Sequence, residues 1–212
     1  MKRVALFVSV VCLTTSLANA NLLSNGDFND PNSTAAPTDW STWSYGGGWA
    51  NHQTNTPPSP IADGVDGTWY MACGGAGNAG GGVYQIVPGA AGLTYTLSVD
   101  AGAQAWWRPQ GEMRLFFLDA ASVVLSSTNP IIVWPATYDT GLPWANYTMS
   151  ALAPSGTSQV KVEFAMNGNE GGTVWFDNAV LTAVPEPSTV GLVAGSLALL
   201  LGSQLRRRVE RS

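Results

Sequence analysis

The stretch Leu93-Thr94-Tyr95-Thr96-Leu97-Ser98-Val99 alternates strictly between apolar and hydroxyl-bearing side chains. Successive side chains of a strand point to opposite faces of a sheet, so this period of two predicts a strand with one buried and one wetted face. Residues 160–166 repeat the pattern: Val160, Val162, Phe164 and Met166 are expected in a core and Lys161 and Glu163 in solvent.

Similar short runs, separated by turn residues, extend along the chain. The chain contains 24 glycines and 13 prolines, while lysine, arginine and glutamate, which cover exposed helix faces, are scarce. We therefore expect an all-β sandwich of about nine or ten strands, without a helix in the domain. The expected strands are residues 22–28, 40–49, 68–73, 83–87, 93–99, 113–118, 123–127, 144–152, 160–166 and 174–181, with a loop over 129–143 and a linker over 182–188. The first of these strands should run into a turn, and the second should have a loose end at Gly46-Gly47-Gly48.

Several of these runs carry a resemblance that covers most of the domain. The opening Leu23-Ser24-Asn25-Gly26-Asp27-Phe28, the central Val83-Tyr84-Gln85-Ile86-Val87 and the closing Trp175-Phe176-Asp177-Asn178-Ala179-Val180-Leu181 occur in the same order as in jelly-roll carbohydrate-binding modules and their galactose-binding-like relatives. The chain resembles that group, which implies a jelly-roll β-sandwich. The fold hosts many activities, so the resemblance alone does not decide the function.

The resemblance also implies one structural calcium ion between the first and last strands. Asp177 matches the closing-strand ligand, whereas the acid that often follows the opening phenylalanine is Asn29 here; Asp27 or Asp30 could replace it. Carboxylate oxygens suit Ca²⁺. The alternative is that Asp177 caps a turn by accepting backbone N–H groups.

Nine tryptophans are many for this length, and three of them are the candidates for glycan stacking. Trp106 and Trp107 are adjacent, so on a strand one of them points away from the core, and Trp134 lies in a proline-bounded loop. An indole offers a flat apolar face that suits a sugar ring. Core packing is the alternative, and we expect it for most of Trp40, Trp43, Trp69, Trp144 and Trp175; exposed aromatics also mark protein contacts.

Charge and residue types argue against two classes of function. Three basic and twelve acidic side chains lie between Asn21 and Ala183, a balance of −9, which disfavours nucleic acid as a partner. The only histidine, His52, is expected in a polar loop without a nucleophile motif beside it, and no pair of carboxylates forms a recognisable glycosidase motif. We expect a protein that is not an enzyme, with a cryptic glycoside hydrolase as the minor alternative.

The first twenty residues have the order of an export signal. Lys2 and Arg3 precede the apolar run 4–17, and Ala18-Asn19-Ala20 is an A-x-A cleavage site, so the signal helix should be removed and the mature chain should begin at Asn21. Cys12 leaves with the signal. Cys73 then has no disulfide partner, and we expect it to be a small buried residue.

The C-terminal residues 184–212 form a tail in three parts. Pro185-Glu186-Pro187 precedes the uncharged run 189–205, which would span roughly 26 Å as a transmembrane helix, and Arg206-Arg207-Arg208 follows as a cytoplasmic basic end. This order resembles the PEP-CTERM sorting tail of Gram-negative bacteria that make exopolysaccharide. The resemblance implies processing by exosortase, a membrane protease-transpeptidase. A plain single-span anchor and, less well, a GPI signal are the alternatives.

Together these features predict a signal peptide at 1–20, a β-sandwich ectodomain at 21–183 and a sorting tail at 184–212. The protein should be anchored in the inner membrane as a precursor and then reach the cell surface or extracellular matrix. Its partners would be exosortase and the exopolysaccharide layer or other glycans. Three function classes are open: a non-catalytic matrix protein, a carbohydrate-binding module with a defined ligand, and a cryptic hydrolase.

Overall fold

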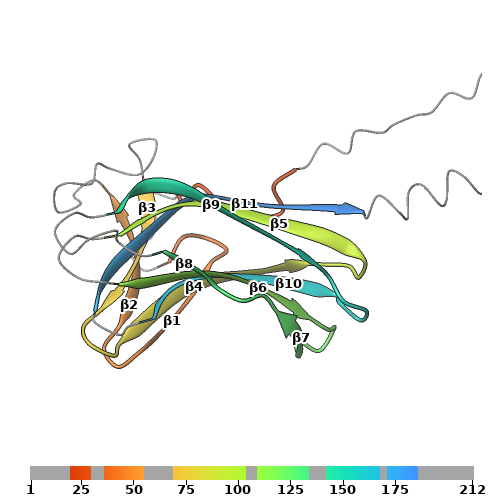
Figure 1. The fold of residues 1–212 in the computed structure, drawn as a ribbon, viewed down its shortest axis with the longest axis horizontal. Coiled ribbons are helices and arrows are strands. Elements are labelled where there is room, and N and C mark those ends of the chain that lie inside the picture. The colour runs from red at the N-terminus through yellow and green to blue at the C-terminus, as the bar shows by residue number, and fades with distance from the viewer. Residues whose placement is uncertain are drawn as a thin grey trace, which may run out of the picture.

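The computed structural model describes residues 20–29, 36–54, 69–103, 109–133, 142–167 and 171–185. Eleven antiparallel strands make up two sheets, with no helix in these ranges (Figure 1). The strands are β1 Ser41–Tyr45, β2 Trp49–Thr54, β3 Trp69–Gly75, β4 Gly80–Pro88, β5 Leu93–Ala103, β6 Gln110–Leu118, β7 Val124–Ser127, β8 Ile131–Val133, β9 Leu142–Leu152, β10 Gln159–Asn167 and β11 Gly172–Pro185. No helix of the described part is long and apolar enough to cross a bilayer.

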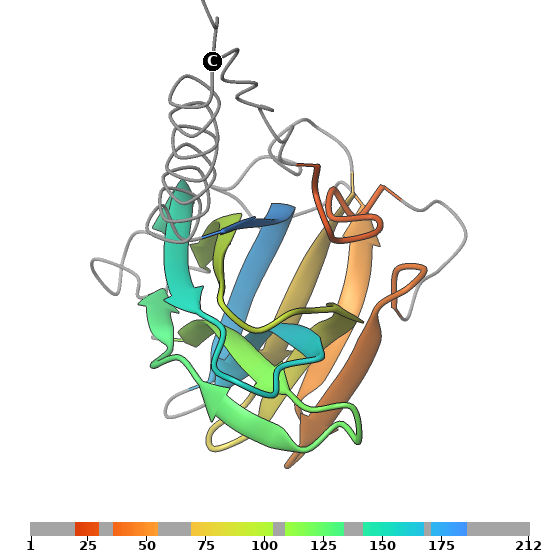
Figure 2. The same ribbon diagram turned by 90° about the vertical axis from the view of Figure 1, so that its right-hand side faces the viewer.

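The two sheets have separate strand orders. One is six-stranded, in the order β1-β4-β10-β6-β7 with β8 also paired to β6, and the other is five-stranded, in the order β2-β3-β11-β5-β9. Chain connections cross between them at the end that faces the viewer in Figure 2, where β4 leads into β5 and β9 leads into β10. The all-β sandwich expected from the sequence is confirmed.

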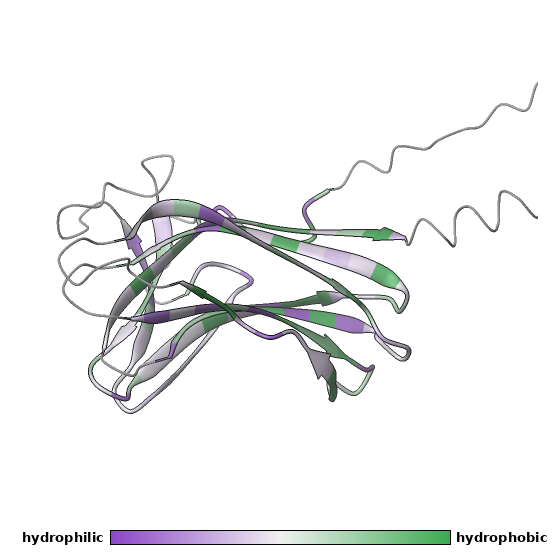
Figure 3. Cartoon of the chain, viewed as in Figure 1, coloured by the Kyte–Doolittle hydropathy of each residue, from purple (hydrophilic) through white to green (hydrophobic). Residues whose placement is uncertain are grey.

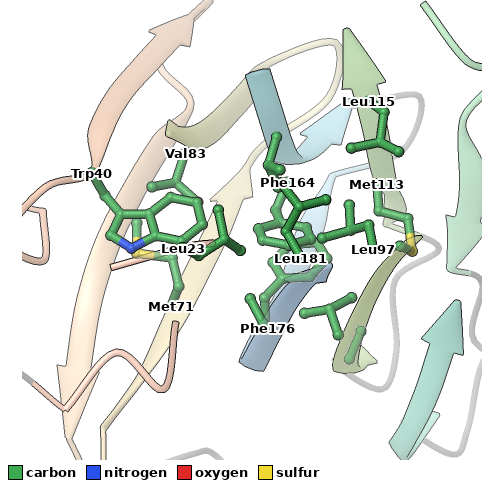
Figure 4. Close-up of a cluster of buried hydrophobic side chains, with 14 of the residues drawn as sticks. Leu23, Trp40, Met71, Val83, Leu97, Met113, Leu115, Phe164, Phe176 and Leu181 are labelled. Atoms are coloured by element: carbon green, nitrogen blue, oxygen red, sulfur yellow. The ribbon is translucent and has the colours of Figure 1, made fainter. Parts of the chain in front are cut away.

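The core between the sheets follows the predicted alternation. Tyr95, Leu97 and Val99 are buried and Leu93 packs against them, and all four apolar members of 160–166 are fully buried. The alternation can be followed by colour along β5 and β10 in Figure 3. Rings join the two layers, as Phe164 of β10 lies parallel to within 25° of Phe176 of β11, with centroids 5.1 Å apart (Figure 4).

Lys161 and Glu163 point away from this core. They form an ion pair of 2.6 Å on the outer side of β10, and their side chains keep 21% and 12% of their exposure. The prediction that they leave the core is confirmed, although neighbouring side chains cover them more than expected.

Residues 22–28 are expected to form a strand that runs into a turn; the turn is present, but no strand forms. The segment forms turns, with positive φ at Asn25 and Phe28, and Leu23 and Phe28 enter the core. Its backbone is held by side chains instead of by a continuous ladder: Ser24 N–H donates to Gln85 Oε1 at 2.9 Å, and Gln85 Nε2 donates back to Ser24 O at 3.0 Å.

Three other boundaries differ from the expectation. The single strand predicted over 40–49 is two strands, because Gly46 and Gly47 take positive φ and turn the chain from one sheet to the other. The loop expected over 129–143 contains β8, and β11 runs on to Pro185 because residues 180–185 stay paired with β5. Pro185 lies opposite Leu93 at the strand end, where the missing N–H of proline costs least.

Candidate functional site

Most of the predicted site residues lie outside the described residues. These are Trp106, Trp107, Trp134, Asp30, Glu186, Pro187, the run 189–205 and Arg206, Arg207 and Arg208. Asp27, Asp177 and Pro185 are described.

The proposed calcium ligands are held by local hydrogen bonds. Asp177 is fully buried, and its Oδ1 accepts the backbone N–H of Asn178 at 2.7 Å, within the β11 bulge. Asp27 accepts from the backbone and side chain of Asn29 at 3.5 and 3.4 Å. Within the described ranges, no three side chains among His, Cys, Asp and Glu gather as a metal site. The bond to Asn178 is a local contact within strand β11, and the described residues do not by themselves assemble a calcium site.

A cluster of aromatic side chains lies on the outer side of the five-stranded sheet, which we term the five-strand face. Tyr70 of β3 and Trp175 of β11 are 1% and 3% exposed and pack with Trp49 of β2 and Trp144 of β9. Their neighbours in sequence, Met71 and Phe176 among them, belong to the main core. Because side chains alternate along a strand, the cluster is on the opposite side of the sheet from the core.

The rings in this cluster meet across strands. Tyr70 and Trp144 have centroids 6.1 Å apart at 73°, an edge-to-face contact, and the Tyr70 hydroxyl donates to Gln53 Oε1 at 3.4 Å. The indole of Trp49 lies against Gly74, since a Cβ built on that glycine would come within 2.4 Å of the Trp49 ring. Trp49 and Trp144 keep partial exposure, and Trp144 Nε1 is a buried donor without an acceptor.

A polar row continues across the same face. Asp177, Asp100 and Asn146 lie opposite one another on β11, β5 and β9. Asp100 accepts from Asn146 Nδ2 at 2.9 Å and from Asn178 Nδ2 at 3.2 Å, and Asn146 Oδ1 accepts from the hydroxyl of Thr148 at 3.1 Å. The face therefore joins partly exposed indoles to an ordered row of amide and carboxylate groups.

The sequence did not identify this face. Core packing is expected from the sequence for most of Trp40, Trp43, Trp69, Trp144 and Trp175. Among the tryptophans in the described ranges, Trp40 is a buried member of the main core and Trp175 is buried in the smaller cluster on the five-strand face. The available signal was alternation: Trp175 is flanked by Val174 and Phe176, which cannot share its side of the strand. Trp43 likewise lies on an outer side, that of the six-stranded sheet, where it is paired with Gly82.

His52 is buried in β2 and not placed in a polar loop as expected. It is 3% exposed, its Nε2 makes a hydrogen bond with the Phe28 carbonyl, and its ring lies 4.3 Å from that of Trp69 at 24°. These contacts tie the N-terminal segment to the sheet, so His52 serves the fold.

Cys73 is buried in the core, as expected. Burial raises the pKa of its thiol far above the usual range, and the nearby charge of Glu163 raises it further. The thiol therefore stays protonated and acts as a small apolar group.

Comparisons with known proteins identify the fold but no family to which the chain belongs. No protein-family model matches the chain, and no curated protein matches it. The Stig cyclase Fisc from Fischerella sp. TAU, solved in complex with an indole compound, superposes with a TM-score of 0.57 at 18% identity, over 78% of this chain and 97% of that one.

Two larger proteins contain a similar domain. An arabinose-bound α-L-arabinofuranosidase gives a TM-score of 0.56 at 16% identity over 78% of this chain. Tailspike protein 4 of bacteriophage CBA120 gives 0.56 at 14% identity over 77%. The matched part is 26% of the first protein and 21% of the second. At these identities the likenesses show the fold alone: the chain is a jelly-roll β-sandwich.

Proposed function

We propose that this protein is an exported, non-catalytic glycan-binding protein of the cell surface or extracellular matrix. The observation that carries the proposal is the five-strand face, where Trp49 and Trp144 are partly exposed beside the ordered row of Asp100 and Asn146. A carbohydrate presents apolar C–H faces and hydroxyl edges, and this face offers both matching surfaces.

The carboxylates of the two outer faces favour binding over hydrolysis. Glycoside hydrolysis needs one carboxyl that gives a proton and one that attacks or activates water. Asp100 already accepts from Asn146 and Asn178, and Glu112 accepts from Gln110, Arg114 and Asn167. These oxygens are thus already occupied by amide and guanidinium donors. We therefore prefer a binding protein to a cryptic hydrolase.

Export and sorting complete the proposal and rest on sequence order. The signal at 1–20 would carry the chain across the inner membrane, and the tail would present Pro185-Glu186-Pro187 to exosortase. Pro185, the first residue of that motif, is paired with Leu93 in β11. Association with the exopolysaccharide layer would then follow from both the tail and the glycan-binding face.

The test is retardation of the purified full chain in native gels that contain soluble polysaccharide. The gels would hold β-1,4-galactan, arabinan, xylan or mixed-linkage β-glucan, with mild non-ionic detergent for the apolar tail. We expect at least one to retard the wild type, and Trp144→Ala to bind about tenfold more weakly, which corresponds to 1.4 kcal/mol.

The matched control is Val123→Ala. Val123 is 57% exposed in the β6–β7 turn, in the other sheet, and its loss should leave retardation unchanged. Normal binding by a folded Trp144→Ala variant would refute the five-strand face as the site. Release of reducing sugar from a retarding polysaccharide would favour the hydrolase.

A further inference from the structure

We propose that the outer side of the six-stranded sheet, the six-strand face, is a second glycan-binding surface. It would take neutral pyranose rings on Trp43 and Tyr45. The ligand class rests on the proposed function, but the residues, the sheet and the direction of the face are different. The domain would then bind glycan on two opposite sides.

The platform of this face is the ring pair of β1. Trp43 and Tyr45 are two residues apart, so both project from the same side of the strand. Their rings are parallel to within 4°, and their centroids are 6.0 Å apart. Tyr45 is 48% exposed, and Trp43 is half-buried. Two parallel rings with one open side suit two neighbouring sugar units of a chain.

Glycines beneath the rings explain why they can lie close to the sheet. Trp43 is paired with Gly82 of β4, and Tyr45 is paired with Gly80. A Cβ on Gly82 would come within 2.6 Å of the Trp43 ring, and one on Gly80 within 2.6 Å of the Tyr45 ring. Any other residue at either position would push the ring away from the sheet. The glycines therefore set the positions of both rings.

A polar network borders the platform. The Tyr45 hydroxyl donates to Asn167 Oδ1 at 3.4 Å, and Asn167 Nδ2 donates to Glu112 Oε2 at 2.7 Å. Glu112 is 4% exposed, and it also accepts from Gln110 Nε2 at 2.7 Å and pairs with Arg114. These groups are fixed before any ligand arrives, so little side-chain freedom is lost on binding.

The charges of the six-strand face select for a neutral ligand. Arg114 pairs with Glu112 and Lys161 pairs with Glu163, so no single charge sign dominates. Lys161 Nζ lies 4.6 Å from the ring centre of Tyr84 and 4.8 Å from that of Phe116, which fixes its position further. An anionic polysaccharide would meet paired cations on a domain with a balance of −9, so neutral sugars fit better.

The two faces point in opposite directions because the core lies between the sheets (Figure 1). A single domain would then bridge two polysaccharide strands, one bound to each face. Binding at two sites raises the apparent affinity for a polymer well above that of either site, as long as both can be engaged together.

The experiment uses the full chain and the same polysaccharide gels, with light scattering of chain and soluble polysaccharide as the measure of bridging. Tyr45→Ala removes the exposed ring, and Gly82→Ala displaces the Trp43 indole without deleting it. Ser44→Ala is the matched control, since Ser44 is exposed on the same strand between the two rings in sequence. Circular dichroism and melting temperature confirm that each variant is folded.

We expect Tyr45→Ala and Gly82→Ala to weaken retardation at least threefold and to abolish the scattering increase. Tyr45→Ala combined with Trp144→Ala should lose retardation. Normal retardation and scattering in both folded single variants would overturn the proposal, and so would lower stability without weaker binding. If Trp144→Ala alone removes all binding, the five-strand face stands and this proposal fails. If only the Tyr45 and Gly82 variants weaken retardation, this proposal stands and the five-strand face fails as a binding site. A wild type that no polysaccharide retards overturns both.

Discussion

The side chain of Asn21 ties the N-terminal segment to β11 through hydrogen bonds, and its removal should destabilise the domain by about 2 kcal/mol. Its Nδ2 donates to the Ala179 carbonyl at 2.9 Å, and its Oδ1 accepts the backbone N–H groups of Leu23 at 3.1 Å and Leu181 at 2.9 Å. Each such bond contributes about 0.5–1.5 kcal/mol net. The group is part-buried, so water replaces some of the three bonds in Asn21→Ala, which places the expected loss near the lower end of their sum.

The loss can be measured by denaturant unfolding and by melting of the purified chain. For a domain of this size about 1 kcal/mol lowers the melting temperature by about 2–4 °C, so Asn21→Ala should melt about 4–8 °C lower. Asn21→Asp keeps the acceptor for Leu23 and Leu181 but loses the donor to Ala179, and it should lie between the alanine variant and the wild type. A change in unfolding free energy below about 0.5 kcal/mol for Asn21→Ala would refute this stabilising role of Asn21.

Three further predictions concern the thiol, the metal and the chain ends. Because burial raises the pKa of Cys73, a thiol reagent at pH 8 should label it only in denaturant, and folding stability should fall as the pH rises above about 8.5, where the unfolded thiol ionises; rapid native labelling would contradict this. If Asp177 binds calcium with help from residues outside the described ranges, millimolar Ca²⁺ should raise the melting temperature above that of an EDTA control. At a hundredfold excess over Kd the gain in unfolding free energy is about 2.7 kcal/mol. Equal melting curves would exclude a useful site. Mass spectrometry of surface protein from a host with exosortase should find a start at Asn21 and no Arg206–Ser212 end, and an intact tail would count against sorting.

The fold was predictable where each strand has one buried and one wetted face. In β5 and β10 a shift of one residue would turn every apolar side chain towards solvent, so the alternation in the sequence fixes the orientation. The turn after β6 was also readable, because Asp119 accepts the N–H groups of Ala121 and Val123 at 2.8 and 2.9 Å, as aspartate does in turns.

The N-terminal segment was misread because its partners are far away in sequence. Leu22 N–H donates to Leu181 O at 2.8 Å, and Ala179 N–H donates to Gly26 O at 2.7 Å, across more than 150 residues. A run such as Leu22-Leu23 has strand propensity, but the bonds to Gln85 and Asn21 hold it in turns. Local propensity is a weak guide where tertiary hydrogen bonds of this kind decide the backbone.

The outer aromatic faces were missed for a related reason. The identity of a tryptophan does not tell whether its side chain faces the core or the outer side of the sheet. Only the pairing with neighbouring strands shows which side it faces. In this chain the informative partner is glycine: four outward-facing aromatics each lie opposite a glycine on the next strand. The pairs are Trp43 with Gly82, Tyr45 with Gly80, Trp49 with Gly74 and Trp175 with Gly102.

These pairs give a physical reason for part of the high glycine content. A glycine within a strand weakens it, since it has no side chain to pack, and an aromatic ring from the next strand restores the lost contact by covering it. The rings are not fully buried, however: Tyr45 is 48% exposed, and Trp43, Trp49 and Trp144 keep part of their surface in solvent. The glycine–aromatic pairs therefore account for how the inner side of these rings packs on the sheets, and the surface that stays open is where the proposed glycan would stack.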